Sequence, residues 1–160
     1  MQNLSATELL YPIYVLFTLT LTLIFIPRDH YKEYLIYGLL VGGLGDIVVV
    51  MLMQNLFGVM QFKNQGIFYV LGHHALSPLA WTLTVMLFLF FLPNRKWFRY
   101  LYVIYWAMMS VGYGYLVHNA ELFEFKSWLY PIPAFFIFIA WWSVATWLFR
   151  RTSNLAKRNL

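Results

Sequence analysis

The residues best suited to chemistry are one carboxylate and two neighbouring histidines, all within apolar sequence. Asp46 stands in the run GGLGDIVVV, and His73 and His74 come shortly before Ser77. Ionisable side chains are costly to keep in apolar surroundings, so their presence predicts a functional site. These residue types can bind a polar ligand, exchange a proton near neutral pH or hold a metal ion. A structural ion pair that fastens two helices together is the alternative.

Apolar stretches long enough to cross a membrane must position these groups. Hydrophobic residues make up 62% of the 160-residue chain and charged residues 11%, against about a quarter charged in soluble domains. Five stretches approach or exceed the ~20 residues that cross ~30 Å of hydrocarbon. The sequence therefore predicts an all-α integral membrane bundle of five transmembrane helices in one domain, residues 1–149, with a basic, frayed cytoplasmic tail at 150–160. The expected spans are residues 9–26, 34–56, 67–92, 100–117 and 128–149.

The basic residues predict the orientation of this bundle. Nine of the 11 Lys and Arg residues follow the first, third or fifth stretch and so lie on one side of the membrane. Only Lys63 and Lys126, which follow the second and fourth stretches, lie on the other side. Loops rich in Lys and Arg stay in the cytoplasm, so the N-terminus is expected outside and the C-terminus inside a bacterial cytoplasmic membrane. The same loops explain the net charge of +5. No nucleic-acid partner is expected, because no basic run interleaves with aromatic residues.

Helical spacing predicts where the polar groups lie. At a rise of about 1.5 Å per residue, Asp46 lies ~12 Å and the two histidines ~9–11 Å from the outer edge of the bilayer. Gly38, Gly42 and Asp46 are spaced by four residues, and glycines on one helix face permit the close approach of a neighbouring helix. Asp46 is therefore expected to point into the bundle.

A helical third span would place three more groups on one face. His73, Ser77 and Trp81 are spaced by four residues, and Pro78, which has no N–H, would leave the carbonyl of His74 free as an acceptor. Tyr113 in the fourth span lies somewhat nearer the outer surface. Together these groups predict a ligand-binding or proton-relay pocket in the outer half of the bilayer, formed by Asp46, His73, His74, Ser77 and Tyr113.

Four tryptophans are expected at mid-depth, although tryptophan prefers the interfaces of a membrane. They could line an aromatic cavity for a planar or acyl ligand, or they could simply fill a small bundle with large side chains. These residues are Trp81, Trp106, Trp141 and Trp142.

No cofactor is expected from the residues present. The chain has no cysteine, and adjacent histidines on a helix point about 100° apart, so they cannot both bind one haem iron. The best metal-binding set is weak because His118 lies too close to the outer surface to meet the other three side chains, His73, His74 and Asp46. P-loop, G-x-S-x-G and H-E-x-x-H motifs are absent from the sequence, so no catalytic residue is assigned.

Several short motifs resemble those of small five-span membrane proteins of spore-forming Gram-positive bacteria. The likeness lies in Ile26-Pro27-Arg28, Ser77-Pro78, the loop 92–96 and the aromatic last stretch that ends in Arg150-Arg151. It runs over most of the chain, implies a five-span fold and brings no reaction or ligand with it. The tryptophan-rich sensory protein family is similar in length and aromatic content, but its Trp-Pro-rich loop after the first helix is replaced here by residues 27–32.

These observations favour a multi-pass membrane protein that binds a small molecule, a lipid or a partner membrane subunit. A proton or ion relay through Asp46 and His73 or His74 is one alternative. A membrane enzyme that acts on lipid with a histidine as general base is another. The lipid bilayer is the expected partner, and Gly38 and Gly42 could also serve a second copy of the chain in a homo-oligomer.

Overall fold

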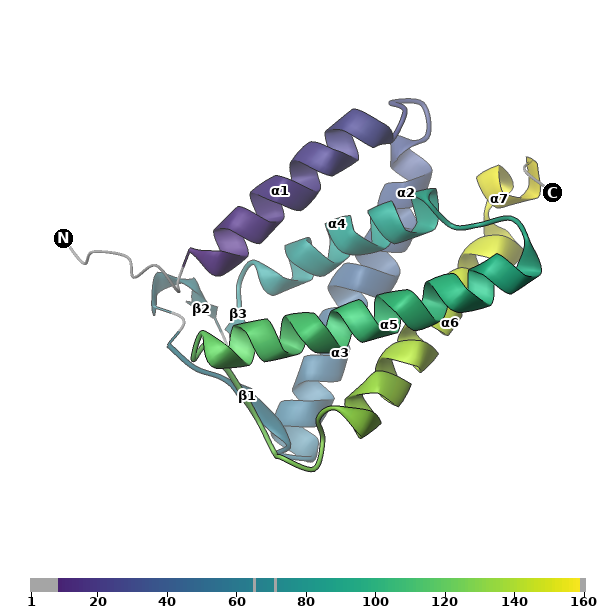
Figure 1. Ribbon diagram of the computed structural model, residues 1–160. Coiled ribbons are helices and arrows are strands. Elements are labelled where there is room, and N and C mark those ends of the chain that lie inside the picture. The colour runs from purple at the N-terminus through teal and green to yellow at the C-terminus, as the bar shows by residue number, and fades with distance from the viewer. Residues whose placement is uncertain (1–8, 65, 71, 159–160) are drawn as a thin grey trace.

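The chain forms five long helical segments in a computed structural model that describes residues 9–64, 66–70 and 72–158 (Figure 1). The first segment is α1 (Leu10–Phe25), and the second is continuous from Tyr31 to Leu56. This second segment combines α-helix with two π-helical parts: α2 (Tyr31–Tyr37), η1 (Gly38–Leu44), α3 (Gly45–Met51) and η2 (Leu52–Leu56). The other segments are α4 (Ser77–Phe90), α5 (Lys96–Asn119) and α6 (Ile132–Thr152), followed by the short α7 (Asn154–Arg158). The prediction of an all-α fold is confirmed.

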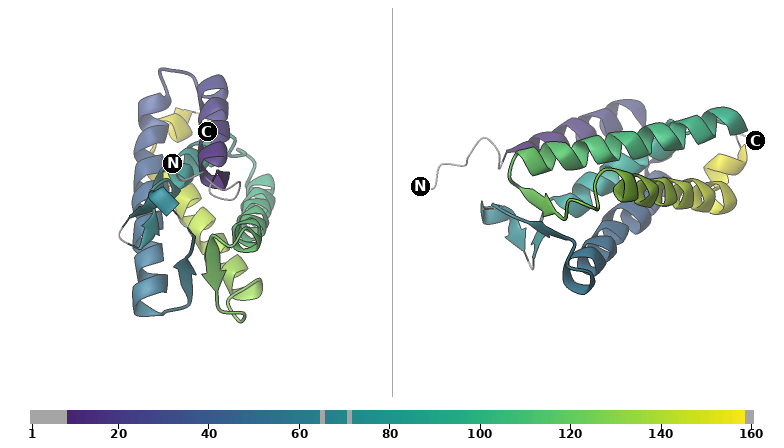
Figure 2. Two further views of the ribbon diagram at one scale, coloured as in Figure 1. Left: turned by 90° about the vertical axis from the view of Figure 1, so that its left-hand side faces the viewer. Right: turned by 60° about the horizontal axis from the view of Figure 1, so that its bottom comes forward.

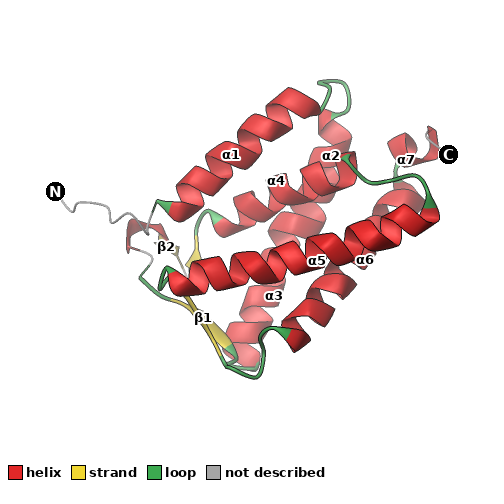
Figure 3. Cartoon of the chain, viewed as in Figure 1, coloured by secondary structure: helices red, strands yellow, loops and turns green. Residues whose placement is uncertain are grey.

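Among the described residues, short strands gather at one end of the helices (Figure 3). β1 (Met60–Phe62) pairs antiparallel with β4 (Phe123–Phe125), so that Gln61 lies opposite Glu124. β2 (Tyr69–Val70) follows the 3-10 turn η3 (Gly66–Phe68) and pairs with β3 (His73–His74). The connection from α4 to α5 and the C-terminal α7 lie at the opposite end (Figure 2).

The third predicted span, residues 67–92, is wrong over residues 67–76, because helix α4 begins only at Ser77. Two glycines account for the difference: Gly66 and Gly72 adopt φ values of +51° and +81°, where other residues are strained. The N–H of Ala75 donates to the carbonyl of Phe68 at 2.8 Å, which closes the hairpin. Pro78 falls in the first turn of α4, where its missing N–H costs little.

The ends of the remaining helices also differ from the prediction. The second segment begins at Tyr31 rather than residue 34, α5 covers residues 96–119 rather than 100–117, and α6 covers 132–152 rather than 128–149. A frayed tail is wrong for residues 154–158, which form α7. Glu33 of α2 holds this helix, because its Oε1 accepts from the N–H of Leu155 at 3.1 Å and from the hydroxyl of Ser153. Residues 159–160 lie outside the described residues.

Two helical segments of the described chain are long and apolar enough to cross a membrane, where five were predicted. They are Tyr31–Leu56, with 26 residues, and Ile132–Thr152, with 21 residues. Helices α1 and α4 have 16 and 14 residues, which is about 24 and 21 Å at the usual helical rise. Helix α5 has 24 residues, and its several tyrosines lower its hydropathy.

Helix α4 lies at the centre of the fold, and α1, the α2–η1 segment and α6 pack around it. Two glycines of η1 permit this packing. A Cβ atom on Gly38 would lie 2.8 Å from the carbonyl oxygen of Thr82, and one on Gly42 would lie 2.7 Å from the backbone nitrogen of Thr82. The face that bears Gly38, Gly42 and Asp46 therefore points into the bundle, as its spacing predicts. Because α4 already covers both glycines, they are not available to a second copy of the chain.

Candidate functional site

A cavity of about 110 Å³ lies between α3, α4, α5 and α6. Its wall includes Asp46 from α3, Ser77 and Trp81 from α4, Tyr113 from α5 and Trp141 from α6. The structure thus brings three residues of the predicted polar pocket and two of the predicted aromatic cavity around one space. These two sites, which the sequence presents separately, form a single cavity.

Three polar atoms of this wall are buried with no hydrogen-bond partner among the described residues: Oδ2 of Asp46, the hydroxyl of Tyr113 and Nε1 of Trp141. Nearly all buried polar groups in folded proteins are hydrogen-bonded, and an unsatisfied one costs about 1–3 kcal/mol. The wall is otherwise mostly apolar. An apolar cavity with a few convergent polar groups is typical of a small-molecule site.

Asp46 contacts the imidazole of His73, which was predicted to lie at a similar depth. Oδ2 of Asp46 lies 3.3 Å from Nε2 of His73, and both side chains are mostly buried. The two atoms lie at ion-pair distance, and neither makes another hydrogen bond among the described residues.

The hydrogen bonds of His73 determine how many protons this pair holds. Nδ1 of His73 lies 2.9 Å from the carbonyl oxygen of His74, and because a carbonyl only accepts, Nδ1 carries a proton. Nε2 is then left to face Asp46. A bare Nε2 lone pair would repel a carboxylate, so the two facing atoms share one proton. The pair is therefore either imidazolium with carboxylate or neutral imidazole with carboxylic acid.

The predicted helical arrangement of the histidines is wrong. His73 belongs to strand β3, so it does not share a helix face with Ser77 and Trp81. The carbonyl of His74 is not left free by Pro78 either, because the ring of His73 donates to it. His73 nevertheless reaches Asp46, since the β2–β3 hairpin folds back against the second helical segment.

His74 does not line the cavity but is packed in the protein interior. Its side chain is 1% exposed and stacks on Tyr11 with ring centroids 3.9 Å apart, with Phe68 at 5.4 Å. The N–H of Leu76 donates to its Nδ1 at 3.2 Å, so the proton of the neutral ring lies on Nε2.

The four tryptophans lie in three different environments. Trp81 and Trp141 line the cavity, and their ring centroids are 5.7 Å apart. Trp106 lines a second hollow of about 220 Å³ between α1, α4 and α5. Trp142 is fully buried in the core and donates from Nε1 to the hydroxyl of Ser110 at 3.0 Å. Trp142 therefore fills the bundle, whereas Trp81 and Trp141 are placed to contact a ligand.

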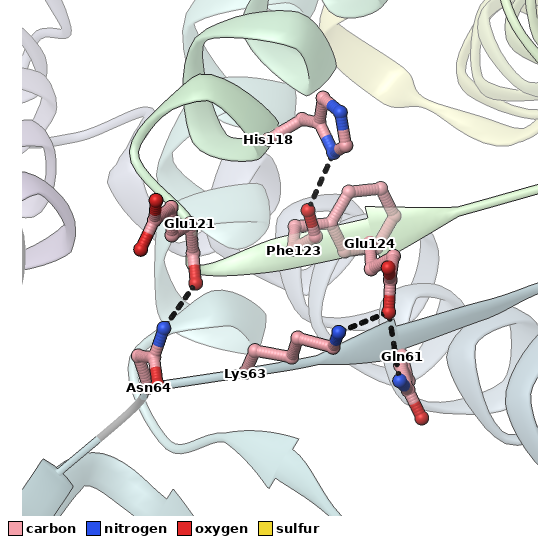
Figure 4. Close-up of polar contacts among 7 residues, drawn as sticks. All are labelled: Gln61, Lys63, Asn64, His118, Glu121, Phe123 and Glu124. Atoms are coloured by element: carbon pink, nitrogen blue, oxygen red, sulfur yellow. Dashed lines mark hydrogen bonds and ion pairs between the residues drawn. The ribbon is translucent and has the colours of Figure 1, made fainter.

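The β1–β4 ribbon covers one end of the cavity, which Met60, Phe62 and Phe123 line. Polar contacts fasten this cover on its other face (Figure 4). Glu124 accepts from Gln61 at 3.0 Å and pairs with Lys63, and these hydrogen bonds lower the pKa of Glu124. Asn64 donates to the carbonyl of Glu121 at 2.9 Å.

The weak metal-binding set does not assemble. His118 lies on the ribbon side, where its Nδ1 donates to the carbonyl of Phe123 at 2.9 Å and its ring packs on Phe125. Nδ1 of His74 accepts from Leu76. No group of three or more His, Cys, Asp or Glu side chains that could hold a metal ion occurs within the described ranges.

Several wall residues were not predicted from the sequence. Tyr11, Ser110, Tyr130 and Phe138 all line the cavity. They come from the start of α1, from α5, from the turn just before α6 and from α6 itself, and no spacing rule links them. Their helical phase relative to Asp46 could have suggested them only if the packing partners of each helix were known.

No protein-family profile, curated protein or solved structure matches this chain. The site must therefore be interpreted from its own geometry.

Proposed function

We propose that the chain is a five-span protein of the cytoplasmic membrane that binds a small molecule in a cavity in the outer half of the bilayer. The five spans would be α1, the Tyr31–Leu56 segment, α4, α5 and α6. The cavity between α3, α4, α5 and α6 would be the binding site.

The outer surface of the helices supports membrane insertion. Large apolar side chains are exposed along the bundle, among them Leu23, Leu39, Met108 and Phe136. Soluble monomers rarely expose apolar patches larger than a few hundred Å². Hydrocarbon would solvate such a surface, whereas water would not.

The distribution of charge supports the orientation. Arg28 and Lys32, Arg95 and Lys96, and Arg150 and Arg151 all lie at helix ends on the side away from the strands. Lys-rich and Arg-rich loops favour the cytoplasmic side, so the strand end, with the cavity beside it, would face outward.

The short helix α4 needs a further argument, because about 21 Å does not cross ~30 Å of hydrocarbon. The hairpin that precedes it supplies the missing length. Irregular backbone at membrane depth is tolerated where protein buries it or where it lines a cavity. His74 in this hairpin is buried, and His73 contacts Asp46, which fits that requirement.

The observation that carries the binding proposal is the pair of buried polar atoms in the cavity wall that have no hydrogen-bond partner among the described residues, the hydroxyl of Tyr113 and Nε1 of Trp141. They belong to two different helices that line one mostly apolar space, and Asp46, paired with His73, lines the same space. A ligand that hydrogen-bonds to the two atoms would remove the cost of their burial.

A compound screen can test this proposal by thermal stabilisation of the purified protein in detergent. Ile137 lines the cavity. Val144 lies seven residues further along α6, which is about two helical turns, and is 55% exposed on the surface of the bundle. Ile137→Trp should fill the cavity and abolish stabilisation by any hit, and Val144→Trp should leave it unchanged. Hits that stabilise the Ile137→Trp variant as well as the original chain would refute a site in this cavity.

A proton relay is the second candidate, favoured by the single proton that Asp46 and His73 share. Such a pair can take up a proton on one side and release it on another. Proton flux driven by a pH gradient in proteoliposomes would test this candidate: flux that disappears in Asp46→Asn supports it, and a rate equal to that of empty liposomes refutes it.

A further inference from the structure

The wall of the cavity is rich in aromatic residues and has one acidic group. Eight of its 20 lining residues are aromatic. Asp46 is the one acidic residue among the described lining residues, which include no Lys or Arg. Trp81 is stacked with Phe138, with ring centroids 5.8 Å apart, and stands 5.7 Å from Trp141. Aromatic faces carry negative electrostatic potential and attract cations.

We propose that the ligand is a small organic cation, a protonated amine or a quaternary ammonium that also bears a hydroxyl group. This inference rests on the proposed binding function of the cavity and specifies its ligand. The ammonium group would lie near Asp46 and the faces of Trp81 and Trp141. The hydroxyl group would accept from Nε1 of Trp141 or exchange a hydrogen bond with the hydroxyl of Tyr113.

Two alternatives fit the wall less well. An anion would meet the carboxylate of Asp46 with no basic residue in the described wall to offset it. A purely apolar ligand would leave the hydroxyl of Tyr113 and Nε1 of Trp141 without a hydrogen-bond partner.

His73 makes cation binding depend on pH. The groups that face Asp46 are His73 from β3, Tyr11 from α1 and Tyr113 from α5. Both tyrosines are neutral, so His73 is the group that can neutralise the carboxylate. A protonated His73 competes with the ammonium for Asp46, and loss of that proton frees the carboxylate. Cation affinity should therefore rise with pH, by up to about tenfold per pH unit while His73 remains protonated.

Choline and its neutral isostere 3,3-dimethyl-1-butanol provide matched probes, because they share shape and hydroxyl group and differ in charge. Isothermal titration of the purified full-length protein in detergent should give an affinity for choline at least about tenfold higher than for the neutral alcohol, since ~1.4 kcal/mol of charge interaction is tenfold. The Asp46→Asn variant should lose this preference for choline. The control variant Asp29→Asn, which removes an exposed carboxylate instead, should retain the preference.

The outcomes separate the ligand class from the site itself. If the neutral alcohol binds as well as choline and both are lost in Ile137→Trp, the cation proposal fails while the cavity remains a binding site. If the screen finds hits that depend on the cavity and choline does not bind, the cation proposal fails in the same way. If no compound depends on the cavity, both proposals fail.

Discussion

Replacing His73 with alanine is expected to destabilise the protein by about 3–5 kcal/mol, because removal of one partner leaves the other charge buried and uncompensated. Oδ2 of Asp46 lies 3.3 Å from Nε2 of His73, and Asp46 itself is 5% exposed. The variant also leaves the carbonyl of His74 without the donor that now contacts it. Unfolding of the purified protein in mixed detergent micelles measures this loss.

Asp46→Asn provides the control for that experiment. Its amide can donate to Nε2 of a neutral His73 while Nδ1 of His73 still donates to the carbonyl of His74, so we expect little change in stability. The double variant Asp46→Asn/His73→Ala should recover much of what His73→Ala loses, since the buried charge is gone. A His73→Ala protein as stable as the parent would show that the two side chains do not form the coupled pair described here.

Gly42→Ala is expected to be the second most damaging change. A Cβ atom at this position would lie 2.7 Å from the backbone nitrogen of Thr82, and a backbone atom cannot move aside without displacing α4. Overpacking of this kind costs about 1–3 kcal/mol. Because α4 carries Ser77 and Trp81, the same displacement should also weaken binding in the cavity. Thermal unfolding and probe titration on one preparation would measure both effects.

Gly112→Ala is the matched control, because Gly112 also lies within a helix and nothing stands within 4 Å of a Cβ built there. Removing a glycine from a helix interior is stabilising by up to ~1 kcal/mol. We therefore expect Gly112→Ala to be neutral or slightly stabilising. Equal losses in Gly42→Ala and Gly112→Ala would indicate a general intolerance of alanine rather than close packing of η1 on α4.

The length of the continuous apolar stretches predicts most of the helices, and the four-residue spacing of Gly38, Gly42 and Asp46 predicts the buried face of the second segment. These features are local, so one stretch of sequence contains them. The hairpin before α4 could not be predicted in this way, because residues 67–76 are apolar enough to continue a helix. Gly66 and Gly72, which adopt positive φ values, are the residues that prevent it, and glycine is also tolerated near a helix end.

The candidate site was predicted in part. The depth of Asp46 and the histidines indicates that they could meet, and the structure places His73 against Asp46 by a route other than a continuous helix. The convergence of Tyr113 and Trp141 on the same space depends on how α5 and α6 rotate about their axes. That rotation is set by long-range packing, such as Trp142 on Phe88 with ring centroids 4.4 Å apart, which no local pattern encodes.

An experimental structure of the protein in lipid nanodiscs tests the central claim most directly. The account predicts density for a bound molecule in the cavity, within about 3.5 Å of the Asp46 carboxylate and in contact with Trp141. A structure in which protein side chains fill this space, with the Tyr113 hydroxyl and Trp141 Nε1 hydrogen-bonded to other protein groups, would contradict it.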